Sequence, residues 1–284
     1  MRAKAIKDLA QLSDNKLFEE VAEGLTIVLE NAACIEADSI FLADQNHPRS
    51  CEILRKISEE ETAKFLILMD AIRSPRQPAS DFANQLARFN DHFSKGFYAE
   101  YYTLRLANFG EVLEYIKQAR EEYFLDGPND VDWIFRNRIL QQREERIYVD
   151  YVENDGEHYW HSPKWPESVE KGMTTFCKMP LDILNLAKSL NQAGCASPKA
   201  LSVIASKWRS VKMTDDFPIS QLRDTNYATL QELDKSGLLR EQPQNIYDTI
   251  INYWLFPLYS ADLRIISVDQ SKLREIQRGW APEF

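Results

Sequence analysis

The stretch from residue 47 to residue 72 constrains the fold most, because charged side chains interrupt its apolar helical pattern. Four aliphatic residues share one face of a helix at about 100° per residue: Ile53, Ile57, Ile67 and Leu68. Glu60 and Lys64 fall on the same face, one turn apart, in the better order for an ion pair. A charge on the buried side of a helix is costly unless it is paired. The pattern indicates either a salt bridge at the surface edge of the helix or an inward-facing polar cluster that serves a functional site.

Apolar spacing predicts long helices in the first half of the chain. The first should run from about residue 14 to about residue 44, and the second from Pro48 to about residue 72. A third begins near residue 82 and carries a stripe of phenylalanines. It can continue to about residue 124, bent or interrupted at Gly96 or Gly110.

The pattern changes in the second half. Residues 131–145 read as a charged helix, and the alternation that follows, with a turn at residues 154–156, predicts a β-hairpin ending near residue 161. Prolines at 163 and 166 mark the expected domain boundary, so we expect domains at 1–165 and 166–284. The second domain should contain helices at 180–193, 198–211, 220–236 and 245–256. The fold class is therefore mostly α, a helical bundle with a short hairpin followed by an all-helical C-terminal extension.

Charge and composition limit the class of protein. The net charge is −10, and residues 1–163 hold 19 Lys and Arg against 30 Asp and Glu. This balance disfavours broad nucleic-acid binding but leaves room for a small basic site. Its candidate members are Arg88, Lys95, Arg136, Arg138, Arg143 and Arg146.

The sequence favours a soluble protein of the cytoplasm. Its longest apolar run, residues 250–259, is too short to span a bilayer, and the N-terminal residues lack the apolar core of a secretory signal. The four cysteines lack a CxxC pair, which favours free buried thiols over a zinc site or a disulfide framework. They are Cys34, Cys51, Cys177 and Cys195.

Three residues of the third helix form a candidate site. Arg88, His92 and Lys95 stand at i, i+4 and i+7, so they should project from one face. This can be an ordinary solvated face. It can also be a catalytic site, because histidine transfers protons near neutral pH and the two cations can hold a phosphate.

The run Glu59–Glu61 could indicate a metal site. Carboxylate-bridged helical bundles, however, use a Glu three residues before a His, and no Glu in this sequence has that position. We expect no metal and no cofactor.

Three blocks of the chain resemble the AbiV-type abortive-infection proteins of the HEPN group. The matching features are Asn31-Ala32, Ala37-Asp38, Glu59-Glu60 with Lys64, then His92 and Lys95 in the block 89–101, and finally Arg146–Tyr151 with Trp160–Pro163. The blocks span about residues 17 to 165. The resemblance implies a HEPN-like bundle there, and nothing comparable covers residues 166–284.

The resemblance also implies an activity. Many HEPN domains are metal-independent endoribonucleases that pair an Arg and a His on one helix with a second copy across a dimer interface. The candidate catalytic residues here are His92, Arg88, Lys95, Glu60 and Lys64. This chain departs from the pattern, because only three residues separate Arg88 from His92, one fewer than the shortest usual spacing. The departure puts the role of Arg88 in doubt more than that of His92, and Lys95 or Lys64 can substitute as the cation.

We therefore expect an anti-phage abortive-infection effector that cleaves RNA or arrests translation. Its expected partners are a second copy of the chain, an RNA substrate (tRNA, rRNA or mRNA), and a phage-encoded or antitoxin-like protein regulator, with no membrane. The alternative is a non-catalytic HEPN-like module that acts by docking or dimerisation. The short Arg88–His92 spacing and the acidic first half favour this alternative.

Overall fold

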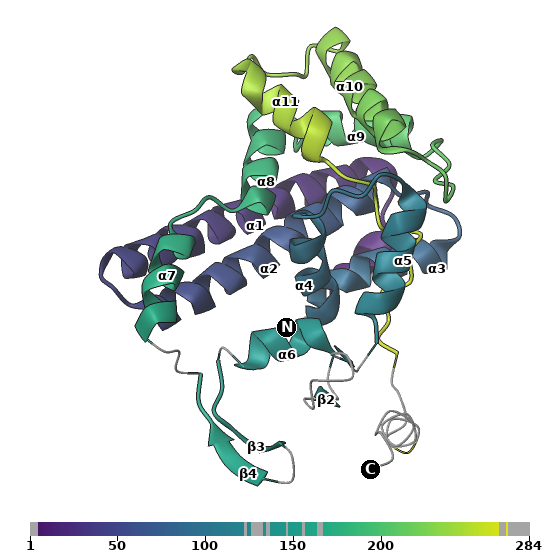
Figure 1. Ribbon diagram of the computed structural model, residues 1–284. Helices are drawn as coiled ribbons and strands as arrows, with labels where there is room; N and C mark the ends of the chain where they lie inside the picture. The colour runs from purple at the N-terminus through teal and green to yellow at the C-terminus, as the bar shows by residue number, and fades with distance from the viewer. Residues whose placement is uncertain are drawn as a thin grey trace.

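The computed structural model describes residues 5–121, 124–125, 133–134, 137–145, 147–154, 157–163, 167–266 and 271. Over these residues the protein is mostly helical, as predicted (Figure 1). The α-helices are α1 (Asp14–Asp44), α2 (Pro48–Arg73), α3 (Ala79–Ala87), α4 (His92–Tyr101), α5 (Phe109–Ala119), α6 (Arg138–Glu145), α7 (Glu167–Cys177), α8 (Asp182–Gln192), α9 (Pro198–Trp208), α10 (Ile219–Lys235) and α11 (Gln244–Tyr253). The shorter elements are the 3-10 helices η1 (Ala5–Gln11) and η2 (Arg88–Asn90) and the strands β1 (Phe124–Leu125), β2 (Trp133–Ile134), β3 (Asp150–Asn154) and β4 (Glu157–His161).

Helices α1 and α2 form a long antiparallel hairpin across the middle of the molecule (Figure 1). Their bounds confirm the two predicted helices. Pro48 opens α2 in the first turn, where its missing N–H has no helical partner to lose. The turn between them contains Asn46 with a φ of 60°, a conformation that asparagine tolerates better than most residues.

The buried face of α2 differs from the prediction in its first half. Ile57 is exposed and Ile53 is only partly buried, whereas Arg55 and Ser58 are buried. These polar side chains can occupy the buried face because they find hydrogen-bond acceptors there: Ser58 Oγ donates to the carbonyl of Ala32 at 2.9 Å, and the Arg55 guanidinium donates to the carbonyl of Met179 at 2.6 Å. Apolar spacing alone therefore gave the wrong face for this half of the helix.

The predicted third helix is three helices, α3, α4 and α5. Asp91 and Asn108 interrupt it, because each caps the helix that follows. Their side-chain oxygens accept a hydrogen bond from the backbone N–H three residues on, at 2.7 and 3.0 Å respectively. The breaks therefore precede these caps, and the expectation of a break at Gly96 or Gly110 was wrong.

Gly96 has another role, within α4. A Cβ at this position would lie 2.5 Å from Cγ2 of Ile139 on α6. The Ile139 side chain therefore occupies the space that a side chain at residue 96 would need, and a glycine there lets α6 lie against α4.

The β-hairpin expected near residue 150 is confirmed. Strands β3 and β4 pair antiparallel, with Tyr151 opposite Trp160. The predicted turn residues Asp155 and Gly156 lie outside the described residues, as do the boundary residues 164–166.

The helix expected over residues 131–145 is confirmed only in its second half. α6 begins at Arg138, because Trp133 and Ile134 form strand β2, which pairs with β1. The expected loop at residues 126–130 lies outside the described residues.

The helices predicted beyond residue 180 are confirmed as α8 to α11, and α7 is an additional helix that the sequence analysis missed. Gly194 and Gly237 follow α8 and α10 with φ values of 89° and 65°. Glycine suits these positions because it adopts positive φ without strain.

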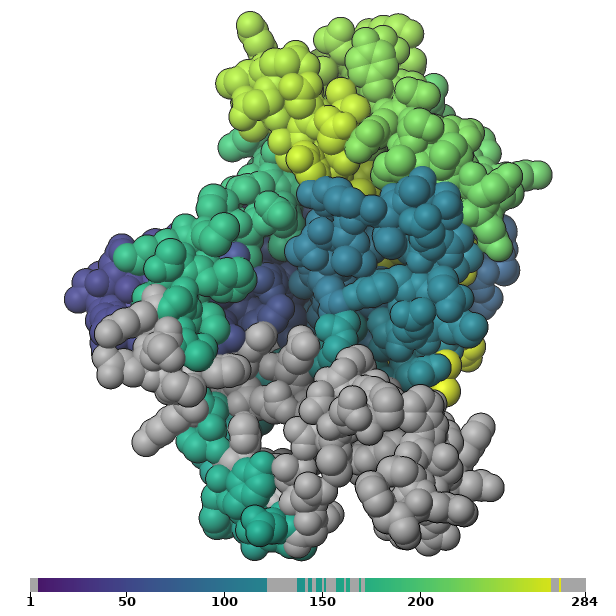
Figure 2. Space-filling view, in the orientation of Figure 1, coloured from purple at the N-terminus to yellow at the C-terminus, as the bar shows by residue number. Residues whose placement is uncertain are grey.

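One continuous hydrophobic core joins the two parts of the chain. It contains buried side chains of α1, α2, α4 and α5 together with those of α8, α9 and the segment 254–263. Figure 2 shows the green and yellow side chains of the C-terminal helices lying directly against the blue region of α4 and α5. The division into domains at residue 165 stays a prediction. Across the described ranges, no helix combines the length and the apolarity needed to cross a membrane.

Candidate functional site

Three helices bring four side chains together, which we call the Glu60 cluster. Glu60 lies in the middle of α2, His92 and Lys95 in the first turn of α4, and Arg143 in the last turn of α6. Nδ1 of His92 lies 3.1 Å from Oε2 of Glu60, and Nζ of Lys95 lies 3.2 Å from the same oxygen. Nε of Arg143 donates to the other oxygen, Oε1, at 2.8 Å.

The cluster is buried at its carboxylate and open at its histidine. The Glu60 and Lys95 side chains are 13% and 8% exposed, and that of Arg143 is 29% exposed. The imidazole of His92 is 51% exposed. A ligand in solution therefore meets the histidine ring first, with the cations beside it.

The charges around Glu60 keep its carboxyl group ionised. Burial on its own would raise the pKa of Glu60. The charge of Lys95, the hydrogen bond with His92 and the charge of Arg143 together outweigh burial and lower this pKa below its ordinary value. An ionised carboxylate at Nδ1 fixes the orientation and tautomer of the imidazole.

Local sequence features position the cluster. The cap at Asp91 fixes the start of α4. His92 and Lys95, three residues apart, are therefore neighbours on the surface of its first turn. Gly96 lets α6 approach, and α6 carries Arg143. Glu60 and His92, two of the candidate catalytic residues named from the sequence, therefore lie in contact.

Lys64 belongs to a neighbouring ion pair. Its ammonium group binds Glu61 and lies 5.3 Å from the ring centroid of Phe89. The expected pair between Glu60 and Lys64 is therefore wrong, because Glu60 points to α4 and α6 instead. Glu59 pairs with basic residues of its own helix, so the three consecutive glutamates have three different sets of partners. In the part of the chain that the structure describes, no three His, Cys, Asp or Glu side chains converge as metal ligands.

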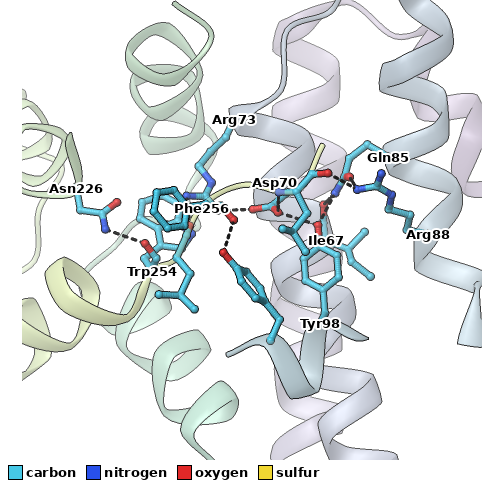
Figure 3. Close-up of polar contacts among 12 residues, drawn as sticks. Ile67, Asp70, Arg73, Gln85, Arg88, Tyr98, Asn226, Trp254 and Phe256 are labelled. Atoms are coloured by element: carbon cyan, nitrogen blue, oxygen red, sulfur yellow. Dashed lines mark hydrogen bonds and ion pairs between the residues drawn. The ribbon is translucent and has the colours of Figure 1, made fainter. Parts of the chain in front are cut away.

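Arg88 has different hydrogen-bond partners from His92 and lies among the buried residues drawn in Figure 3. It belongs to η2, before the cap of α4, so the predicted shared helical face does not exist. Its buried guanidinium donates to the carbonyl of Leu258 at 2.7 Å, to Oε1 of Gln85 at 2.6 Å and to the carbonyl of Ala261. These partners direct Arg88 toward the C-terminal segment.

Arg88 is part of a buried network with Asp70, Arg73, Gln85 and Tyr98, drawn in Figure 3. Asp70 accepts hydrogen bonds from Arg73 and from the Tyr98 hydroxyl at 2.7 Å. It also accepts the backbone N–H of residue 258 at 2.9 Å. This network ties the second half of α2 to α3, α4 and the C-terminal segment.

Two tryptophans complete the buried network. The guanidinium of Arg73 lies 4.7 and 4.5 Å from the ring centroids of Trp208 and Trp254, and donates to the carbonyl of Leu255 at 3.0 Å. Cation–π contacts of this kind gain strength when they are desolvated. Residues of the C-terminal helices therefore contribute directly to stabilising the buried positive charge of Arg73.

A cleft of about 620 Å³ lies between α3 and residues 259–265. Arg88 and Asp91 line it, whereas Glu60 and Arg143 are not among its lining residues. The donors of Arg88 already bind carbonyl groups. The cleft is thus separate from the Glu60 cluster, and the chemistry of the cluster makes the cluster the better candidate for a functional site.

The role of Arg143 was not predicted. This residue stood in a broad basic set, but no local pattern in the sequence showed that α6 would bring it to Glu60, 83 residues earlier. Arg138 of the same set pairs with Glu100 instead. Arg136 and Arg146 lie outside the described residues.

Comparison with known families agrees with this arrangement of helices. The model of the family described as AbiV, HEPN_AbiV, matches residues 20–177, which is more than half of the 284 residues. The match contains all four members of the Glu60 cluster and ends at the last residue of α7. No curated protein and no solved structure shows significant similarity to the chain. The chain belongs to the AbiV family of HEPN proteins.

Proposed function

We propose that this protein is an anti-phage abortive-infection effector that cleaves RNA at the Glu60 cluster, without a metal ion, and so shuts down translation in the cytoplasm. One observation carries the proposal. The half-exposed imidazole of His92 is held at Nδ1 by the buried carboxylate of Glu60, with Lys95 and Arg143 on the same carboxylate. A carboxylate-oriented histidine beside two cations suits transfer of a proton at a phosphate.

His92 acts as the general base. With Nδ1 held by Glu60, Nε2 takes the proton of a ribose 2′-hydroxyl. The 2′-oxygen then forms a bond to the adjacent phosphorus while the bond from phosphorus to the 5′-oxygen breaks. Glu60 stabilises the imidazolium that results. The products are a 2′,3′-cyclic phosphate and a 5′-hydroxyl end.

Lys95 and Arg143 hold the phosphate. Arginine suits this role because its planar guanidinium donates two parallel hydrogen bonds to phosphate oxygens. Nε of Arg143 donates to Glu60, and the side chain is 29% exposed. In this proposal Arg143 replaces Arg88 as the arginine that offsets charge in the transition state.

A homodimer completes the reaction. The leaving 5′-oxygen needs a proton, and a second His92 across a twofold axis would supply it, since C₂ contacts are the commonest oligomer geometry. The exposure of His92 leaves its ring accessible to such a partner. The substrate class is RNA, whether tRNA, rRNA or mRNA, and a phage-encoded or antitoxin-like protein would control the activity.

The test is incubation of the purified full-length protein with total RNA in excess chelator. Cleavage should proceed and leave cyclic phosphate ends, and His92→Ala should lower the rate by about 10²–10⁴-fold. His47→Ala is the matched control, because His47 is an exposed histidine outside the cluster and its loss should change nothing. Cleavage that stops on adding chelator, or that survives His92→Ala, contradicts the mechanism.

One observation favours a non-catalytic docking module as the second candidate. Glu60 already pairs with both cations of the cluster, and Arg88 is buried against carbonyl groups. Toxicity in phage-infected cells that persists undiminished in His92→Ala, with no RNA cleavage in vitro, would select this candidate over the nuclease.

A further inference from the structure

Two cysteines meet at the opposite end of α2 from the buried network. Sγ of Cys51 lies 2.8 Å from Sγ of Cys177, although the two residues are 126 positions apart in the sequence. Cys51 stands in the first turn of α2, and Cys177 is the last residue of α7. Both residues are buried, at 0% and 1% exposure.

The surrounding contacts hold the two sulfurs together. The cysteines and Ala43 form a small hydrophobic cluster of their own, apart from the main core. Arg55, one turn after Cys51, donates to the carbonyls of Cys177 at 3.4 Å and Met179 at 2.6 Å. Its guanidinium also lies 4.5 Å from the ring centroid of Phe176. The end of α7 is thus fixed to α2 on both sides of Cys177.

We propose that Cys51 and Cys177 form a reversible disulfide that fastens α7 to α2 when the protein is oxidised. A disulfide bond is about 2.05 Å long, so the sulfurs must approach by less than about 1 Å. The contacts of Arg55 already hold the backbone at the end of α7. Closure therefore requires side-chain rotation and no rearrangement of helices.

Hydrogen peroxide is a sufficient oxidant. One thiolate attacks a peroxide oxygen, the O–O bond breaks, and a sulfenic acid forms together with hydroxide, which takes up the proton that the thiol lost. The second thiol then attacks the sulfenic sulfur. The S–S bond forms, the S–O bond breaks, and the oxygen leaves with the proton as water. Two thiols and one peroxide give one disulfide and two waters, and thiol reductants reverse the bond.

The remaining two cysteines provide internal comparisons. Cys34 is exposed on α1, and burial raises the pKa of Cys195 to about 12. Burial, together with the hydrogen bond from Cys51, also raises the pKa of Cys177. Thiolate is the reactive form, so the buried pair should oxidise more slowly than the exposed Cys34. The pair should therefore crosslink α7 to α2 under sustained oxidation and should not respond to brief oxidation.

The bond would close a loop that contains α3 to α6 and therefore His92, Lys95 and Arg143. Crosslinking a loop of this length restricts the unfolded chain and stabilises the folded one. We expect oxidation to raise the Tm of the full-length protein by roughly 5–10 °C. Hydrogen exchange across α7 should slow at the same time, because α7 can no longer separate from α2.

Non-reducing peptide mapping tests the proposal. The full-length protein is reduced, treated with hydrogen peroxide, alkylated and digested with trypsin. The expected product is residues 50–55 joined to residues 172–178, and reductant should separate them. After prolonged oxidation, Cys51 and Cys177 that are still free and alkylated, whether or not Cys34 has been oxidised, would overturn the proposal.

Matched variants distinguish the effect of the Cys51–Cys177 disulfide from the effects of oxidation elsewhere in the protein. Cys34→Ser with Cys195→Ser should keep both the linked peptide and the rise in Tm. Cys177→Ser should lose both, and Cys51→Ser provides the same measurement from the other side of the bond. A rise in Tm on oxidation that persists in Cys177→Ser and Cys51→Ser would also overturn the proposal.

Discussion

Two polar clusters on α2 use similar chemistry in opposite surroundings. Glu60 and Asp70 are ten residues apart, about 15 Å along the helix axis, and each carboxylate binds a basic side chain and a ring from α4. The Asp70 and Arg73 side chains are 0% exposed, whereas the His92 ring of the Glu60 cluster is 51% exposed. The difference lies in access to water.

Access to water decides what each cluster does. In the buried network, a lost partner leaves a charge that water cannot reach, so the network can only hold the fold together. In the Glu60 cluster, water or a phosphate can take the place of the exposed His92 ring at low cost. Mutations around Asp70 should therefore lower the stability of the fold, whereas mutations around Glu60 should mainly affect RNA cleavage, although both carboxylates lie on α2.

The largest effect is expected for Asp70→Asn. The substitution keeps the shape but leaves the buried guanidinium of Arg73 without its counter-ion, so we expect a loss of about 3–5 kcal/mol in the free energy of unfolding. Chemical denaturation measures it. Asp81→Asn, at an exposed position of α3, is the control and should stay within about 0.5 kcal/mol. A loss below about 1 kcal/mol for Asp70→Asn would mean that the two clusters do not differ in their contribution to stability.

Arg88→Ala should have the second-largest effect on stability and should not affect RNA cleavage. It removes the donors to the carbonyls of Leu258 and Ala261, which stay buried, and we expect a loss of about 2–4 kcal/mol. RNA cleavage per folded molecule should not change, because Arg88 binds the C-terminal segment. His92→Ala should show the reverse, with cleavage lost and the Tm nearly constant. Loss of cleavage in folded Arg88→Ala would return Arg88 to the active site.

Gly96→Ala tests the link between packing and the cluster. The added methyl group would lie 2.5 Å from Cγ2 of Ile139, so the Ile139 side chain, or α6 with it, must move. We expect a loss of about 1–3 kcal/mol in stability and weaker binding of Arg143 to Glu60. Thermal denaturation measures the first, and the cleavage rate of the folded protein the second. Adding Ile139→Ala, which removes the clashing methyl group, should restore part of the activity. No recovery in the double variant would mean that the clash is not the cause.

The parts of the fold and of the site that local patterns determine could be predicted from the sequence. The α1–α2 hairpin followed from apolar spacing and Pro48, and Glu60, His92 and Lys95 were named as candidate site residues from their residue types and from the family resemblance. Arg88 was misplaced although a local signal existed, since Asp91 is a good helix cap. The partners of Arg88 and Arg143 lie up to 173 residues away along the chain, and periodicity does not specify which helices meet.

The smallest expected effect is the pH dependence of the Glu60 cluster. The lowered pKa of Glu60 means that its ion pairs add stability above its unfolded pKa, near the ordinary value of 4.5, and that this stability is lost as the pH falls through the folded pKa. Glu60→Gln removes the charge at every pH. Its stability should therefore lie about 1–2 kcal/mol below that of the natural protein at pH 7, and the difference should shrink as the pH falls below 4.5. Denaturation curves of both proteins between pH 3 and pH 7 measure the difference. A difference that is constant over this range would mean that packing of the side chain, and not its charge, holds α2, α4 and α6 together at this point.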